Sequence, residues 1–242
     1  MTDVQQSDDI EASPHGGENL EVMAEARNYN RFLCDLVRRY SNDADNVVDF
    51  GAGIATFSGC LGLPMRDVHC VETESASRDA IVRKGFNAYS DISELPPGSI
   101  SYAFSLNVLE HIEDDARAID DLFGVLEPGG RLFVYVPAFN VLYTSMDSHV
   151  GHRRRYRLRG LVDLIETAGF AVEKSAYTDA LGYFATLALK LIDKREPAPL
   201  NPKLVRFYDR ALFPLSRLMS VPLARILGKN VFVVARKPDQ VQ

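Results

Sequence analysis

The chain has 242 residues, of which 46% are hydrophobic and 25% are charged, as is usual for a soluble globular protein. This length suits one large domain or a domain with an appendage, and no apolar run approaches the roughly 18 residues that a membrane span needs. The net charge of −6 combines an acidic stretch 1–146, at −14, with a basic stretch 147–242, at +8. A basic second half favours an anionic substrate or surface as partner, although a solvated basic face explains it equally well.

Residues 1–20 are polar and acidic and contain no apolar segment. We therefore expect a disordered leader rather than a secretory signal, and a cytoplasmic protein. The cysteines, Cys34, Cys60 and Cys70, are odd in number and widely spaced in apolar segments. This pattern predicts reduced core cysteines rather than disulfides or a cysteine metal site, and we expect no metal site elsewhere.

Apolar spacing and turn residues predict the order of helices and strands along the chain. Helices are expected at 21–40, 56–62, 75–84, 114–125 and 158–168, and strands at 47–50, 67–71, 88–90, 100–106, 131–136, 170–175 and 231–236. Strands that alternate with helices in this way predict a doubly wound, mostly parallel α/β sheet. Residues 21–176 and 230–238 would form this core.

The stretch 177–229 breaks the alternation and is expected to be a helical insertion that caps the sheet edge. Two apolar stripes at helical spacing would pack inward, with Pro214 kinking the second helix. They comprise Tyr183, Phe184, Leu187, Ala188, Leu191 and Ile192, then Leu204, Tyr208, Ala211, Leu212, Leu215 and Met219. Basic residues flank both stripes, so the insertion could also cover an apolar acceptor, with Tyr183 as a substrate contact, or rest peripherally on an anionic membrane.

The segment 47–56 reads as a short apolar strand that ends in an acid and then turns through two glycines. Gly51 and Gly53 let the backbone turn tightly and approach a ligand, and Asp49 adds a carboxylate at the end of the strand. This arrangement is typical of sites for nucleoside-containing cofactors at the edge of a parallel sheet. NAD(P) and S-adenosylmethionine are both cofactors of this kind.

Two further acids end the next two predicted strands. Glu72 stands where a carboxylate can accept both ribose hydroxyls, and Asp91 stands where it can accept an adenine amino group. Three acids at the ends of three consecutive strands are poorly explained as solvated turn residues. No third glycine follows Gly53 at the dinucleotide spacing, and S-adenosylmethionine has no phosphate to cradle, so the set favours S-adenosylmethionine over NAD(P).

Across residues 25–175 and the last strand, the chain resembles the class I S-adenosylmethionine-dependent methyltransferases. Val-Val-Asp-Phe-Gly-Ala-Gly at 47–53 is similar to the family's first motif, with Ala55 in place of its common third glycine, and the segments 105–112 and 126–132 resemble later ones. The resemblance implies a Rossmann-like sheet of seven strands whose last strand is antiparallel. The cofactor-binding residues that it implies are Tyr29, Asp49, Gly51, Ala52, Gly53, Glu72, Thr73, Asp91, Ile92, Asn107 and His111. Of these, His111 is interpreted as a structural part of the cofactor pocket.

The loop Asp147 to Tyr156 is the most distinctive remaining stretch. Its Asp-x-x-x-Gly-His-x-Arg-Arg-Tyr pattern resembles one in a methyltransferase subgroup, of which many members are linked to natural-product or glycan pathways. A histidine can act as general base and arginines can bind a carboxylate or phosphate, so we predict His152 and His149 as catalytic and Arg154 and Tyr156 as substrate-binding. The alternative is that the loop's charged residues form a structural network that pins the loop and caps the next helix.

These observations predict methyl transfer to a small-molecule acceptor, anionic or apolar, with O-methylation favoured and N- or C-methylation open. The segment after the fourth predicted strand reads Asn107-Val108-Leu109 and lacks the Asn/Asp-Pro-Pro-aromatic motif of the methyltransferases that act on nucleic-acid amines, so no nucleic-acid partner is expected. Two alternatives remain, an NAD(P)-dependent oxidoreductase and a non-catalytic S-adenosylmethionine-binding scaffold.

Overall fold

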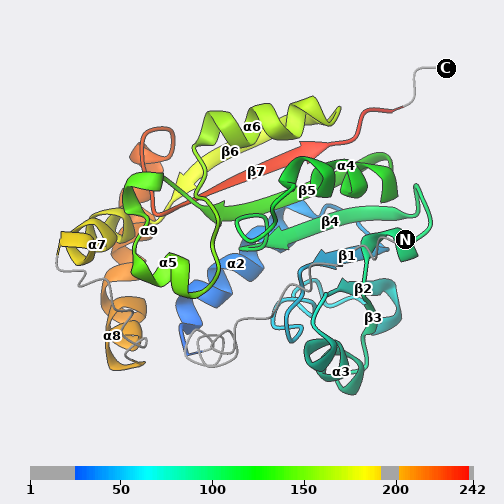
Figure 1. Cartoon of the computed structure of the whole chain (residues 1–242), viewed down its shortest axis with the longest axis horizontal. Coiled ribbons are helices and arrows are strands. Elements are labelled where there is room, and N and C mark those ends of the chain that lie inside the picture. Colours follow the sequence, from blue (N-terminus) through cyan, green and yellow to red (C-terminus); the bar gives the residue numbers. More distant parts are fainter. Residues whose placement is uncertain (1–24, 192–201, 240–242) are drawn as a thin grey trace, which may run out of the picture.

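The computed structural model describes residues 25–191 and 202–239, and its centre is a seven-stranded sheet (Figure 1). The strand order is β3-β2-β1-β4-β5-β7-β6. The strands are β1 Val47–Phe50, β2 Val68–Val71, β3 Asn87–Tyr89, β4 Ile100–Leu106, β5 Leu126–Pro137, β6 Ala171–Thr178 and β7 Asn230–Arg236. Only β7 runs against its neighbours, β5 and β6, among these strands. The doubly wound, mostly parallel fold with an antiparallel last strand is therefore confirmed.

Helices cover both faces of the sheet. The longer ones around the core are α2 Arg27–Tyr40, α3 Ser75–Arg83, α4 Asp115–Val125 and α6 Leu158–Thr167. Successive side chains of a strand point to opposite faces of the sheet, so each strand contributes side chains to both helix layers. Phe104 and Phe133 pack with α2, whereas Leu132 and Val134 pack with α4 and α6.

The helix predicted at 56–62 is absent, and residues 51–62 form turns instead. Gly51, Gly53 and Gly62 have positive φ, and so does Ala55 at 58°, which an α-helix does not accommodate. A disulfide between Cys34 of α2 and Cys60 also ties these turns to the helix. The prediction of three reduced cysteines was therefore wrong for this pair, while Cys70 is free and buried.

The start of α2 depends on a residue far away in the chain. Its N-cap position, Ala26, offers no side-chain acceptor. Instead the buried carboxylate of Asp209 accepts the backbone N–H groups of Asn28, at 3.0 Å, and Tyr29, at 2.9 Å. A carboxylate at a helix N-terminus also complements the helix dipole, so this contact joins the core to the insertion.

The insertion follows β6 and consists of α7 Ala180–Leu191, α8 Pro202–Phe207, a π-helical turn Tyr208–Leu212 and α9 Phe213–Leu223. Figure 1 shows α7, α8 and α9 grouped beyond the end of the sheet where β5 ends. The π turn lies just before Pro214, the predicted kink; Pro214 cannot donate a backbone hydrogen bond.

The inward face of the insertion combines the buried side chain of Phe213 with buried polar groups, and much of the predicted apolar stripes is exposed. The buried Asp179 carboxylate accepts hydrogen bonds from the Gly182 N–H, the Ser216 hydroxyl and the Tyr208 hydroxyl. Leu204 and Leu215 of the second stripe are 64% and 49% exposed. Hydrogen bonds to two buried carboxylates, Asp179 and Asp209, therefore help to hold these helices in place. Ile192 of the first stripe lies outside the described residues.

The outer face of the insertion is apolar and basic. Its exposed large apolar residues are Phe184, Leu189, Leu191, Leu204, Phe207, Leu215, Leu218, Met219, Val221 and Ile226. The two acidic residues of the insertion that the structure describes, Asp179 and Asp209, are buried and therefore do not contribute negative charge to this face. In the part of the chain that the structure describes, no helix is both long and apolar enough to cross a bilayer. Peripheral contact with an anionic membrane and a cytoplasmic location stay predictions.

The Cys34–Cys60 bond gives a direct test of how the glycine turns are held. The two residues are 26 positions apart, and closing a loop of that size stabilises a fold by about 3 kcal/mol. In urea unfolding without reductant, Cys60→Ser should lower the free energy of unfolding by about that amount. Dithiothreitol should remove most of the difference, and an equal difference in both conditions would show that packing, not the bond, is responsible.

Candidate functional site

The carboxyl ends of β1, β2, β4 and β5 bring the predicted site residues to one edge of the sheet. From β1 the chain passes to β2 and β3 on one side and to β4 and β5 on the other, so the order reverses beside β1. Ligands of open α/β sheets bind at such a switch point. The glycine turn, Glu72, the segment after β4 and the loop after β5 all belong to this edge.

The glycine turn is held against two of these neighbours. Gly51 has φ +76°, and a Cβ built there would lie 2.3 Å from a Val108 methyl carbon, so only glycine lets the segment after β4 approach this closely. Gly53 donates its backbone N–H to Oε2 of Glu72 at 2.8 Å. The first motif, Glu72 and the segment after β4 therefore form one connected unit.

Asp49 is buried beneath this unit and accepts a hydrogen bond from the Ser58 hydroxyl at 2.7 Å. Burial raises the pKa of Asp49 to about 7, Ser58 opposes the rise, and the charge of Glu72 adds to it. Glu72 beside the glycine turn offers this edge a carboxylate that can pair with positive charge or accept hydroxyl donors, and Asp49 lies buried behind it.

Asp91 and Ile92 follow β3, which pairs with β2. Asp91 is exposed and caps the short 3-10 helix Ile92–Glu94, accepting the Ser93 N–H at 2.8 Å, while the Ile92 side chain is buried. Hydrogen bonding to Ser93 lowers the pKa of Asp91. Beside them, Glu72 donates its N–H to the Tyr89 carbonyl at 3.0 Å, which sets the ends of β2 and β3 side by side.

Tyr29 and Asn107 form the far side of the same edge. Asn107 adopts a left-handed φ of 57° directly after β4, and its N–H donates to the Tyr135 carbonyl at 2.7 Å. The Tyr29 ring makes edge contacts with Tyr135 and with Phe213 of the insertion. Burial raises the pKa of Tyr29 to about 12, and hydrogen bonds with Tyr135 and Asn107 partly oppose this rise. Tyr29, one of the predicted cofactor-binding residues, thus lies between the core and the insertion.

Of the remaining predicted cofactor residues, Ala52 is buried next to the glycine turn and Thr73 is exposed beside Glu72. The Thr73 hydroxyl lies 3.5 Å from Glu72 Oε1. Both lie where the resemblance implies, and their cofactor roles stay predictions.

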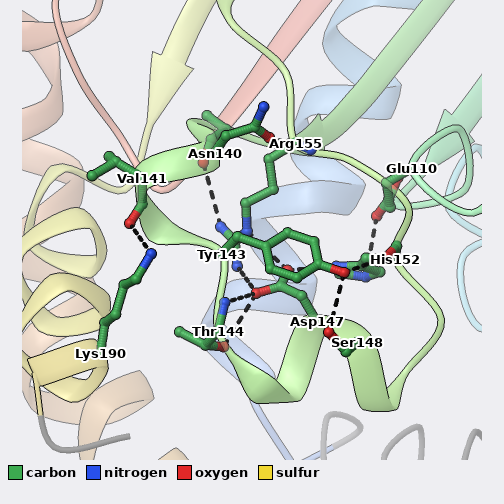
Figure 2. Close-up of polar contacts among 11 residues, drawn as sticks. Glu110, Asn140, Val141, Tyr143, Thr144, Asp147, Ser148, His152, Arg155 and Lys190 are labelled. Atoms are coloured by element: carbon green, nitrogen blue, oxygen red, sulfur yellow. Dashed lines mark hydrogen bonds and ion pairs between the residues drawn. The ribbon is translucent and has the colours of Figure 1, made fainter. Parts of the chain in front are cut away.

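The loop after β5 is organised by one carboxylate, that of Asp147 in the short helix α5 Ser145–His149 (Figure 2). Oδ1 pairs with His152 Nδ1 at 2.7 Å and accepts Arg155 Nε at 2.8 Å; Oδ2 accepts Arg155 Nη2 at 3.0 Å and the Thr144 N–H at 2.8 Å. Burial alone would raise the pKa of Asp147, but hydrogen bonds from His152 and Arg155 lower it well below its usual range. The anion is therefore permanent, and it fixes the His152 ring.

The other face of His152 meets the segment after β4. His152 Nε2 lies 3.8 Å from Glu110 Oε1, and its ring stands nearly perpendicular to that of His111, with centroids 4.7 Å apart. Glu110 is fully buried, which raises its pKa to about 8. Desolvation of the ring beside His152 lowers the pKa of His111 to about 4, although part of the residue is exposed to solvent.

Arg154 and Tyr156 engage the start of α4. Arg154 Nη1 pairs with Asp115 at 3.0 Å, and the Tyr156 hydroxyl donates to Asp115 Oδ2 at 2.7 Å. Both contacts belong to the pinning network that the sequence left as an alternative, and the predicted substrate roles of these residues stay predictions.

The two remaining predicted residues lie on opposite sides of the loop. His149 ends α5, and Tyr183 of α7 packs edge-on against Phe139 of the loop. The site residues that the sequence reasoning missed are Glu110, Asp115 and Arg155. Glu110 and Asp115 had a signal in the acid-rich run 110–115, of which residues up to 112 were assigned to a methyltransferase motif and residues from 114 onward to a helix.

With this geometry established, comparison with known proteins decides the family. A family model described as a methyltransferase domain matches residues 23–175. The chain belongs to the methyltransferase-domain family. A probable S-adenosylmethionine-dependent methyltransferase of Mycolicibacterium smegmatis is 34% identical over 103 residues, which cover 42% of this chain and 38% of that protein. The chain therefore matches well under half the length of that relative.

Solved structures share the fold at low identity. A methyltransferase of Thermotoga maritima, described as a possible histamine N-methyltransferase, has a TM-score of 0.62 at 17% identity and covers 91% of this chain and 95% of its own. Geranyl diphosphate C-methyltransferase of Streptomyces coelicolor, solved with Mg²⁺, geranyl diphosphate and S-adenosylhomocysteine, has a TM-score of 0.61 at 13% identity, covering 95% and 89%. These likenesses show the class I methyltransferase fold.

The residues at the sheet edge fit S-adenosylmethionine, the cofactor of the family. Glu72 and Asp91 can accept ribose and adenine protons, and the carboxylates near the glycine turn suit a cofactor that carries ammonium and sulfonium charges but no phosphate. Gly53 N–H is already bonded to Glu72, so this turn presents a carboxylate rather than a phosphate cradle.

The buried Asp49 predicts a pH-dependent stability in the absence of ligand. Its folded-state pKa of about 7 exceeds the ordinary 3.8, so from about pH 4 to 7 the folded state retains a proton that the unfolded state has released. Stability should therefore fall as pH rises through this window. In urea unfolding between pH 4 and 8, Asp49→Asn should abolish the decrease in the free energy of unfolding that Asp49 causes, which is up to about 4 kcal/mol. The exposed Asp120→Asn serves as control, and a fall that persists unchanged in Asp49→Asn would contradict the assignment.

Proposed function

We propose that this protein transfers a methyl group from S-adenosylmethionine to the hydroxyl oxygen of a small-molecule acceptor. The observation that carries the proposal is the fixed orientation of His152. Asp147 holds Nδ1 at 2.7 Å, which leaves the Nε2 lone pair facing Glu110 and His111 at the edge where the cofactor residues gather.

The cofactor half of the proposal rests on Asp49, Gly53 and Glu72. When bound, S-adenosylmethionine supplies a methyl group that its sulfonium has already activated. The chain's own residues then have to orient the two reactants for in-line displacement and exclude water. Tyr29 of α2, which contacts Tyr135 of the core and Phe213 of the insertion, would close the edge over the cofactor.

The acceptor half rests on the chemistry that an oriented imidazole offers. A neutral alcohol or phenol is a poor nucleophile until its proton is removed or polarised, whereas a neutral amine already has a free lone pair. An imidazole held by a carboxylate can accept a proton or ligate a metal ion, and both activate a hydroxyl. His152 is therefore the activating residue, and O-methylation is the reaction that uses it best.

A small molecule suits this loop better than a nucleic acid does. In the described loop, Arg153 pairs with Glu113, Arg154 with Asp115, and Arg155 with Asp147. Each guanidinium is neutralised by an acid of the same edge, so the loop offers no continuous basic track for a phosphate backbone. Binding of a neutral, weakly anionic or apolar acceptor does not require such a basic track.

Cofactor binding is tested by calorimetry with S-adenosylhomocysteine. Glu72→Ala removes the carboxylate proposed to hold the ribose and should weaken binding about 10-fold to 100-fold, the value of charge-assisted hydrogen bonds. Glu166→Ala, on the exposed face of α6, is the matched control. Wild-type affinity in Glu72→Ala, or no binding at millimolar ligand in either protein, would contradict the cofactor site.

The acceptor side is tested by S-adenosylhomocysteine release with a panel of phenols, alcohols and hydroxy acids. His152→Ala should lower kcat by about 100-fold or more, while the affinity for S-adenosylhomocysteine stays unchanged, because acid–base activation contributes on that scale. Unchanged turnover would remove His152 from the reaction. Tight cofactor binding without turnover on any acceptor would favour the scaffold alternative.

A further inference from the structure

Glu110, His111 and His152 bring three potential metal-ligating groups to one place. Their ligand atoms all lie within 4.8 Å of one another. Glu110 and His111 follow β4, whereas His152 comes from the loop after β5, so two loops meet around one point. The backbone joins them as well, because Arg153 donates its N–H to the Glu110 carbonyl at 2.8 Å.

The Glu110 carboxyl is buried without a hydrogen-bond donor. Its exposure is 0%, and neither oxygen has a hydrogen-bond partner among the described residues. His152 Nε2, at 3.8 Å, is beyond hydrogen-bond distance, and the Arg155 guanidinium is committed to Asp147. A buried carboxylate in this state costs several kcal/mol unless a cation sits beside it.

The His152 ring is held from outside the cluster, because its Nδ1 is paired with Asp147. A carboxylate behind the ring fixes the orientation in which Nε2 points toward Glu110, as is usual for histidines that bind metals. The His111 ring stands beside it, with ring centroids 4.7 Å apart.

The geometry points to a binding site for a divalent transition-metal ion formed by Glu110, His111 and His152. Two imidazoles and one carboxylate suit Zn²⁺, Co²⁺, Fe²⁺ or Mn²⁺, whereas Mg²⁺ and Ca²⁺ favour oxygen ligands throughout. The 3.8 Å between His152 Nε2 and Glu110 Oε1 needs only a small contraction to the roughly 3.3 Å between ligands around tetrahedral zinc.

The site is open on one side, because His111 is exposed while Glu110 lies at the base. Three protein ligands with an open position are typical of metal sites that act on a substrate. The metal's role, unlike its binding, rests on the proposed function. The open position would take the acceptor hydroxyl, whose proton passes to solvent buffer as the O–CH₃ bond forms and the S–CH₃ bond breaks, releasing S-adenosylhomocysteine. The sequence predicted no metal site because it gave no sign that His152 would meet Glu110 and His111.

Metal binding can be measured with neither cofactor nor acceptor, so its outcome is independent of methyl transfer. The full chain without an affinity tag is stripped with chelator and titrated with Zn²⁺ by calorimetry and with Co²⁺ by visible absorption. We expect one ion per chain. Glu110→Gln and His111→Asn should each weaken Zn²⁺ binding more than about 100-fold, and Asp147→Asn about 10-fold to 100-fold.

Two controls separate loss of the site from loss of the fold. Glu113→Gln and His69→Asn change an acid and a histidine outside the cluster and should bind Zn²⁺ as the wild type does. The circular dichroism spectrum and the urea unfolding midpoint of every variant, each compared with the wild type, report whether the fold is retained. Less than a tenth of an ion per chain, or equal Zn²⁺ affinity in Glu110→Gln and wild type, would overturn the proposal.

Discussion

The buried carboxylate of Asp147 is the interaction on which the candidate site depends. It takes hydrogen bonds from a helix N-terminus, a guanidinium and an imidazole at once, and so turns an irregular loop into a rigid one. Arg155 pairs with both oxygens of the same carboxylate, and His152 Nε2 is left on the side that faces Glu110. Together with the backbone hydrogen bond from Arg153 to Glu110, this anion holds His152 against the segment after β4.

The same device, a buried carboxylate that collects donors from distant segments, recurs in the insertion. Asp209 caps α2, and Asp179 gathers α7, the π turn and α9 around one oxygen. Lys190 of α7 donates to the Val141 carbonyl in the loop after β5 (Figure 2). The insertion thus contacts both the helix that carries Tyr29 and the loop that carries His152. It therefore helps to position residues of the candidate site.

Much of the fold could be predicted from the sequence, because it depends on local pattern. The alternation of strands and helices and the acids at strand ends are short-range features, and the sheet order and Glu72 by the glycine turn agree with them. The predictions that were wrong concern features that depend on contacts between residues far apart in the sequence. The Asp209 cap joins residues 181 positions apart, and Leu204 and Leu215 of the insertion are exposed although their spacing predicted that they pack inward. The helix predicted at 56–62 is replaced by turns that a disulfide holds to α2. Glu110 was overlooked because its importance depends on the burial of its carboxyl group. The burial of a loop residue cannot be predicted from the spacing of residues in the sequence.

The central claim is that the acceptor is activated at the cluster of Glu110, His111 and His152, facing the cofactor. A crystal structure of the full chain with S-adenosylhomocysteine tests this most directly, because the sulfur marks the position from which the methyl group departs. The account predicts that the adenosine lies along Glu72 and Asp91 and that the sulfur faces this cluster. A sulfur atom directed away from the cluster, or separated from it by protein side chains, would contradict the account.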